Sequence, residues 1–374
     1  MVKYLQRYPP KIKKCIKTLN QFITVNKNYK IETLRGIAII LVVLGHVIGS
    51  KNDGGLRVAD DSFLRYVYYT FQYLRMPLFT VISGWVYSLY PVKVGMSSTF
   101  IKKKIRRILV PMLIVGGLFY ILQSIVPNTN ASGSLRDIWT LVVLPYTFYW
   151  YLQSLFLVFV LVGLLDSIKK INQFQQWLFF TTFTIAILFL RDVFIPEEVP
   201  NVFGFKGAIY LLPFFSIGLG VQRFKKELSN HVFLKAIAVI VILGLVFQQL
   251  AWFKLVSYTF TEKDMLGWTI GLLASFLFLH NPLESKRLVH IGKYAYTIFL
   301  FHGFGTAGGR ILAGLVGIQE TGVVLLISLK LGLFSPILVE KIATKSSLLR
   351  FLLLGKSLQK KVIKNTHQPV NPIV

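Results

Sequence analysis

The sequence predicts an all-α membrane protein, a polytopic helix bundle of about ten transmembrane helices. Its mean hydropathy is +0.60, and hydrophobic residues make up 54% of its 374 positions. Charged residues make up only 15%, whereas a soluble domain carries about 25%. The apolar residues also gather in runs of about 17–25, the length that a helix needs to cross a bilayer.

Ten apolar segments of roughly spanning length follow one another along the chain. We expect transmembrane helices at residues 33–50, 66–90, 105–126, 149–166, 176–195, 207–222, 232–252, 264–281, 288–307 and 319–340. The stretch 134–147, which contains Trp139 and Pro145, is predicted to form an interfacial helix or a re-entrant piece. An even number of spans places both termini on the same side of the membrane.

The distribution of Lys and Arg predicts the orientation. If the N-terminus is cytoplasmic, 29 of the 42 basic residues fall in cytoplasmic segments and 8 fall in the opposite loops. Because positive charge concentrates in cytoplasmic loops, we expect both termini in the cytoplasm and a multi-pass protein of the cell (inner or plasma) membrane. The net charge of +27 is then a topology signal, so no nucleic-acid partner is expected.

The predicted organisation is a transmembrane domain, residues 31–341, between two basic cytoplasmic tails, residues 1–30 and 342–374. The tails are suited to contact the anionic head groups of membrane lipids. The first thirty residues lack an apolar core, so no cleaved signal peptide is expected. The single cysteine, Cys15, excludes an intramolecular disulfide, and no metal-binding motif is present, so no metal is expected.

Arg35 and His46 lie on one apolar segment with only neutral residues between them. Eleven residues at about 100° each bring the two side chains to the same helix face, and about 16 Å separates them along the axis. Ionisable residues inside a membrane are costly and mark functional sites by default. This pair is therefore the first candidate for chemistry.

Arg75 and His302 are predicted to lie at a depth similar to that of His46, although the three belong to different spans. If the three side chains converged on one buried cavity, the free-energy cost of placing them inside the membrane would be tolerable. Each also has a structural explanation. A histidine can bond a neighbouring helix, Arg75 can act as a counter-charge, and Arg35 can extend to the membrane surface.

A basic cluster, Lys102 to Arg107, precedes the third predicted span. It is a topology determinant in one interpretation. In the other, Lys103, Arg106 and Arg107 bind phosphate groups on the cytoplasmic side. Ser83, which precedes Gly84 in the second span, is either a ligand-binding hydroxyl or part of a small-residue helix contact.

Four motifs in order resemble the acyltransferase-3 family of integral membrane acyltransferases, many of which O-acetylate bacterial surface polysaccharides. The resemblance spans residues 30–340. The motifs are Leu34-Arg35-Gly36-Ile37-Ala38 with His46, Arg75-Met76-Pro77-Leu78-Phe79 with Ile82-Ser83-Gly84-Trp85, Arg106-Arg107-Ile108-Leu109-Val110-Pro111, and the stretch from Ile291-Gly292-Lys293-Tyr294 to Phe301-His302.

The resemblance implies acyl transfer from an acyl-CoA, usually acetyl-CoA, that reaches the protein from the cytoplasm. Arg35, Lys103, Arg106, Arg107 and Ser83 would then bind the donor. His46 would act as a general base on an acceptor hydroxyl or as a covalent acyl relay, and Arg75 or His302 would stabilise the thioester oxyanion or orient His46. Both roles of His46 stay open.

The acceptor implied by the resemblance is a cell-envelope glycan, as in exopolysaccharide biosynthesis, or a free or lipid-linked sugar precursor.

The sequence departs from the family pattern at one motif. Many relatives have Asp-Gly-Leu-Arg where this sequence has Glu32-Thr33-Leu34-Arg35. Several relatives carry a hydrolase-like domain after the bundle. This sequence continues for only 34 residues after its last predicted span, so we expect the membrane unit alone to do the chemistry. The alternative is a transporter or flippase for an anionic or sugar-containing cargo. Assembly into a homo-oligomer is left open.

Overall fold

The computed structural model describes residues 10–126, 134–261 and 264–358. Every regular element in these ranges is helical, which confirms the all-α prediction. The helices are α2 (Pro10–Ile48), α3 (Phe63–Leu89), α4 (Ser97–Lys104), α5 (Val110–Ile125), α6 (Thr140–Val143), α7 (Trp150–Ser167), α8 (Phe174–Phe194), α9 (Phe205–Arg223), α10 (His231–Trp252), α11 (Met265–His280), α12 (Lys286–Gly292), α13 (Ala295–Leu315), α14 (Thr321–Ala343) and α15 (Ser347–Leu354).

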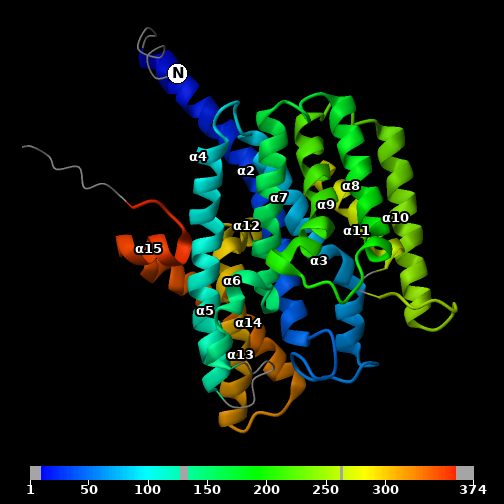
Figure 1. Cartoon of the computed structure of the whole chain (residues 1–374), viewed down its shortest axis with the longest axis vertical. Helices are drawn as coiled ribbons and strands as arrows, with labels where there is room; N and C mark the ends of the chain where they lie inside the picture. The colour runs from blue at the N-terminus through cyan, green and yellow to red at the C-terminus, as the bar shows by residue number, and fades with distance from the viewer. Residues whose placement is uncertain (1–9, 127–133, 262–263, 359–374) are drawn as a thin grey trace, which may run out of the picture.

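Helices α2 and α3 form the centre of the bundle, as Figure 1 shows. On one side α3 packs against α9 and α11, and α9 in turn packs against α7 and α8. On the other side α2 packs against α12, α13 and α14, and α13 and α14 make an extensive antiparallel contact. A side chain on the inner face of α2 can therefore meet residues from both halves of the molecule.

Small residues let the central helices approach closely. A Cβ atom on Gly84 of α3 would lie 2.0 Å from the carbonyl oxygen of Phe215, and one on Gly218 of α9 would lie 1.9 Å from that of Val81. No side chain larger than hydrogen fits at either position, so the two backbones are in direct contact. Gly84 thus makes the small-residue helix contact that the sequence offered as one explanation of the Ser83-Gly84 pair.

All ten predicted spans correspond to helices. Eight helical stretches of the described residues are long and apolar enough to cross a membrane. The other two predicted spans are α3, which carries Arg65 and Arg75, and α11, which is apolar but only 16 residues long. The bundle is therefore polytopic, while the count of ten and the cytoplasmic termini stay predictions.

One predicted span has the wrong limits. Residues 288–307 do not form one helix, because α12 ends at Gly292 and α13 begins at Ala295 and continues to Leu315. At this end α12 packs closely against α2. A Cβ atom on Gly292 would lie 1.8 Å from the carbonyl oxygen of Glu32. This break thus coincides with a tertiary contact between the short α12 and the long α2, which hydropathy does not record.

The stretch 134–147 forms short helical pieces, and its predicted interfacial or re-entrant position stays a prediction. A 3₁₀ turn at Leu135–Asp137 and the four-residue α6 lead to a second turn at Thr147–Tyr149. The predicted tails have described portions too, because α2 begins at Pro10 and α15 follows α14 directly. The rest of the two predicted tails, residues 1–9 and 359–374, lies outside the described residues.

Candidate active site

The structure brings His46, His302 and Arg75 together. The ring centroids of His46 on α2 and His302 on α13 lie 5.0 Å apart. Phe148, from the turn before α7, packs edge-on against His46 at 5.5 Å and lies 4.3 Å from His302. Side chains from four separate parts of the chain thus form one group, which we call the His46 centre (His46, His302, Arg75 and Phe148).

The two histidines differ in exposure. His302 is completely buried, whereas the His46 side chain is exposed although it stands among Phe148, His302 and Arg75. Since neighbours surround the His46 ring but part of its surface stays accessible, the ring must face open space between the helices. His46 is therefore the member of the centre that a substrate can touch, and His302 lies behind it.

Hydrogen bonding defines the tautomer of neutral His302. Its Nδ1 lies 2.8 Å from the carbonyl oxygen of Phe299 and 3.2 Å from that of Ile298. A carbonyl oxygen only accepts, so Nδ1 carries the proton and donates it. The lone pair of neutral His302 is then on Nε2, which is buried and has no hydrogen-bond partner. This nitrogen can accept a hydrogen bond from the neighbouring His46 ring.

Arg75 fits against the residue that precedes His46. A Cβ atom on Gly45 would lie 1.9 Å from Nη1 of Arg75, so only glycine leaves room for the guanidinium. The guanidinium carbon also lies 3.9 Å from the ring centroid of Tyr68, in cation–π contact on the same helix. Arg75 thus brings a fixed positive charge beside His46. The sequence interpretation missed Gly45, Tyr68 and Phe148, and a glycine directly before a membrane histidine was the one available signal.

Arg35 lies nearer the start of the membrane segment and is already paired. Its Nη1 lies 2.5 Å from Oε1 of Glu32, one turn earlier on α2, and its side chain is 31% exposed. The exposure leaves the guanidinium accessible to a second anion. Helix α12 crosses α2 at this level, where a Cβ atom on Gly36 would lie 2.3 Å from the carbonyl oxygen of Leu288.

The predicted phosphate cluster lies on a π-helical turn, Ile105–Leu109, between α4 and α5. π-Helical turns are rare in proteins, and those that occur are often found at functional sites. Lys103 and Arg107 are exposed. Arg106 is half-buried, and its Nε donates to the carbonyl oxygen of Gly355 at 3.2 Å. The Tyr296 hydroxyl donates to the carbonyl oxygen of Arg107, so this cluster meets the α12–α13 junction.

Further cations reach this end of the bundle from α12 and the residue after it. Lys286, Arg287 and Lys293 are exposed, and their short helix is the one that packs on α2 beside Glu32 and Gly36. The sequence interpretation missed them as binding residues, although they directly precede the Tyr294 motif. We call the region that holds Arg35, these three cations and the 103–107 cluster the basic end.

Ser83 has a local partner. Its hydroxyl donates to the carbonyl oxygen of Phe79 at 3.0 Å, one turn earlier on α3. Tyr151, which is fully buried, lies beside this turn, and its hydroxyl is 3.4 Å from that of Thr80. Ser83 therefore has a packing role in the structure, and its predicted role in donor binding stays a prediction.

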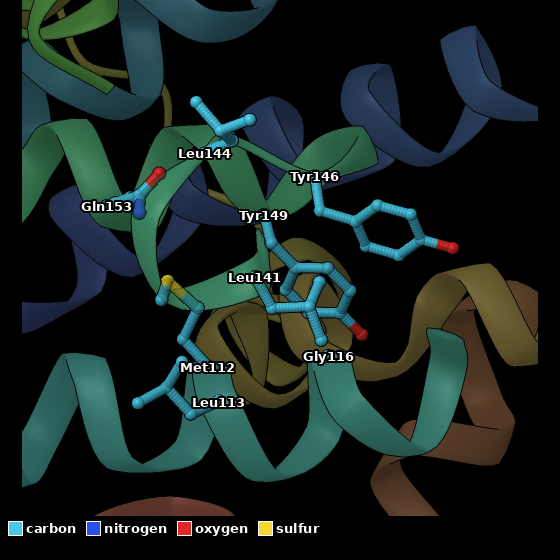
Figure 2. A pocket seen from close by; sticks show the side chains of 8 residues that line it. All are labelled: Met112, Leu113, Gly116, Leu141, Leu144, Tyr146, Tyr149 and Gln153. Carbon is cyan, nitrogen blue, oxygen red and sulfur yellow. The ribbon is translucent and has the colours of Figure 1, made fainter. Parts of the chain in front are cut away.

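Figure 2 shows a small cavity between α5 and the segment 141–153. Tyr149 and Gln153 are among its lining residues, and its volume is about 10 Å³. That volume holds one water molecule at most, so this cavity does not bind a substrate. Among the described residues, no group of three or more His, Cys, Asp or Glu side chains lies close enough to hold a metal ion.

Comparison with known proteins identifies the family. A family described as the acyltransferase domain matches residues 28–339, which include every member of the His46 centre. The nodulation protein NolL of Mesorhizobium japonicum is 27% identical over 152 residues, 40% of this chain and 39% of that protein. The match therefore spans about two fifths of NolL. No solved structure matches the chain. The chain belongs to this acyltransferase family.

Proposed function

We propose that the protein moves an acyl group, in the first instance acetyl, from cytosolic acyl-CoA to a hydroxyl of a cell-envelope polysaccharide or of its sugar precursor. The basic end would face the cytoplasm and the protein would lie in the inner or plasma membrane. The exposed His46 beside a buried His302 with an unpartnered Nε2 is the observation that carries the proposal.

The basic end supplies the donor site. Exposed cations from α12 and the 103–107 cluster match the phosphates of CoA. Arg35 is the innermost of them, and the helix rise puts it about 16 Å from His46. A donor whose phosphates bind near Arg35 would then extend its pantetheine arm along α2, so that the thioester reaches His46.

The His46 centre supplies the chemistry. His302 Nε2 has no partner in the structure, and in the reacting complex it would accept a hydrogen bond from one ring nitrogen of His46. The other nitrogen of His46 would then be free as a base. As the acceptor oxygen attacks the thioester carbon, its proton passes to His46. The C–O bond forms, the C–S bond breaks, and the CoA sulfur takes the proton from His46. Arg75 stabilises the negative charge that develops on the carbonyl oxygen.

A covalent route uses the same residues. The free nitrogen of His46 attacks the thioester carbon, the C–S bond breaks, and CoA leaves as the thiolate. The acceptor oxygen then attacks the acylated imidazole, the C–N bond breaks, and the hydroxyl proton goes to water while the CoA thiolate takes a proton from water. This route predicts an acylated protein intermediate, whereas the general-base route does not. A single experiment can therefore separate the two.

The test uses the full chain in lipid nanodiscs with radiolabelled acetyl-CoA, comparing the wild type with His46→Ala. We expect release of CoA and label on an added envelope glycan, with a fall of about 100- to 10,000-fold in kcat for His46→Ala. His280→Ala is the matched control, because His280 lies on α11 and bonds the Phe276 carbonyl of its own helix.

Label that stays on wild-type protein before glycan is added would favour the covalent route. Wild-type rates in a correctly inserted His46→Ala variant would refute the role of His46. Flux of an anionic sugar into proteoliposomes without any acyl donor, and without thioester consumption, would instead support a transporter.

A further inference from the structure

A long groove on the side of the bundle lies outside the His46 centre. It runs between α3, α10 and α11 and has a volume of about 670 Å³, within the range of about 300–1,000 Å³ for ligand sites. The α10 residues that line it form one stripe: His231, Leu234, Lys235, Ala238, Val241, Leu245 and Gln248. The other faces of α10 carry exposed apolar residues such as Ile242 and Leu243, so the groove opens toward the bilayer.

The lining of the groove is polar at one end and apolar along most of the rest of its length. His231 and Lys235 lie at the end where α10 begins, together with Asn281 after α11. None of the lining residues is acidic. The first backbone N–H groups of α10, those of Val232 and Phe233, already donate to the Asn230 side chain, so the side chains of Lys235 and His231 set the character of this end. This end is therefore suited to an anionic head group.

The apolar part of the groove matches one leaflet. The stripe extends over ten residues from Lys235 to Leu245, which correspond to about 15 Å of helix. One leaflet has the same depth, because the hydrocarbon core of a bilayer is about 30 Å thick. The next lining residue, Gln248, is fully buried, and its Nε2 donates to the Tyr69 carbonyl oxygen at 2.8 Å. Its Oε1 is buried without a partner. This polar group ends the apolar wall near mid-membrane, which disfavours a much longer isoprenoid chain.

We propose that this groove is a binding site for one anionic phospholipid. One acyl chain lies along the apolar stripe, and the phosphate meets Lys235 and His231 at the start of α10. The groove is separate from the acyl-donor site, since Tyr73 and Leu74 line it while the adjacent Arg75 contacts Gly45 on the far side of α3. The proposal therefore does not depend on the function proposed above.

The experiment is native mass spectrometry of the full chain in detergent, titrated with dioleoylphosphatidylglycerol or with dioleoylphosphatidylcholine. We expect one tightly held phosphatidylglycerol per protein and weaker binding of phosphatidylcholine. Lys235→Glu should weaken phosphatidylglycerol binding at least fivefold, because one Lys near a membrane surface contributes about that factor. Lys226→Glu is the matched control, an exposed lysine at the same end that does not line the groove.

A second pair of variants tests the groove itself. Ala238→Trp should fill it and remove the bound lipid, whereas Val239→Trp changes the adjacent, 55% exposed residue outside it and should leave binding intact. Equal binding of the two lipids by the wild type, or equal losses in Lys235→Glu and Lys226→Glu, would overturn the proposal. So would a polyprenyl phosphate as the lipid that copurifies. The lysine pair decides the question if Ala238→Trp does not fold.

Discussion

The His46 centre and the basic end hold their charged side chains in different ways. In the centre, Phe148 packs against His46, Gly45 leaves room for Arg75, and the carbonyl oxygens of α13 accept from His302, so each side chain has a specific neighbour. At the basic end most cations are exposed, and Arg35 is paired with Glu32 on its own helix. A fixed centre suits bond making, which depends on geometry, and an adaptable cationic surface suits the capture of a flexible, highly charged donor.

If this contrast is correct, substitutions in the centre should change kcat and those at the basic end should change KM for acyl-CoA. The sharpest tests of this contrast are substitutions that shift a side chain of the His46 centre without removing it.

The largest of these effects is expected for Gly45→Ala. The added methyl would lie 1.9 Å from Nη1 of Arg75 and must displace the guanidinium. We expect kcat to fall about 100-fold, because a displacement of about 1 Å has that cost, with KM for acyl-CoA little changed. Gly117→Ala on α5 is the control, since nothing lies within 4 Å of its Cβ position. Steady-state release of CoA measures both, and equal activity of the two variants would contradict the packing of Arg75 beside His46.

A smaller effect is expected for His302. Its proposed role is to accept one hydrogen bond from His46, so His302→Ala should lower kcat roughly tenfold, the value of one hydrogen bond of about 1.4 kcal/mol. In His302→Gln the amide oxygen can still accept, and part of the rate should return. A purely structural role would instead lower the thermal stability of both variants and give no rescue by Gln.

The smallest effects belong to the basic end. Arg35→Gln should raise KM for acyl-CoA about fivefold and leave kcat nearly unchanged, because it removes one charge-assisted contact with phosphate. Lys103→Gln removes a fully solvated charge and should raise KM only about twofold. Both effects should shrink as salt is added. If Arg35→Gln instead lowered kcat and left KM unchanged, Arg35 would take part in the chemical step, and the proposed difference between the His46 centre and the basic end would be wrong.

Much of the fold was predictable because the membrane imposes it. Apolar length fixes the spans, and the depth of His46, Arg75 and His302 within them correctly predicted that they meet. Contacts that depend on tertiary packing were not predictable. Phe148 reaches the centre from a turn with no spanning signal, and the break between α12 and α13 coincides with the contact of Gly292 with α2. The pairing of Arg35 with Glu32, three residues apart on a helix, could have been read from spacing alone.

Arg35 and His46 belong to one uninterrupted helix, α2, with no proline after Pro10. The separation between Arg35, the proposed phosphate anchor, and His46, the proposed base or acyl relay, is therefore set by the helix, because an inserted residue would rotate one side chain by about 100° relative to the other. Such a spacer selects donors by length. A short thioester without the nucleotide half of CoA cannot engage both residues, so the protein would distinguish CoA esters from simpler acyl thioesters by reach, independently of the acyl group they carry.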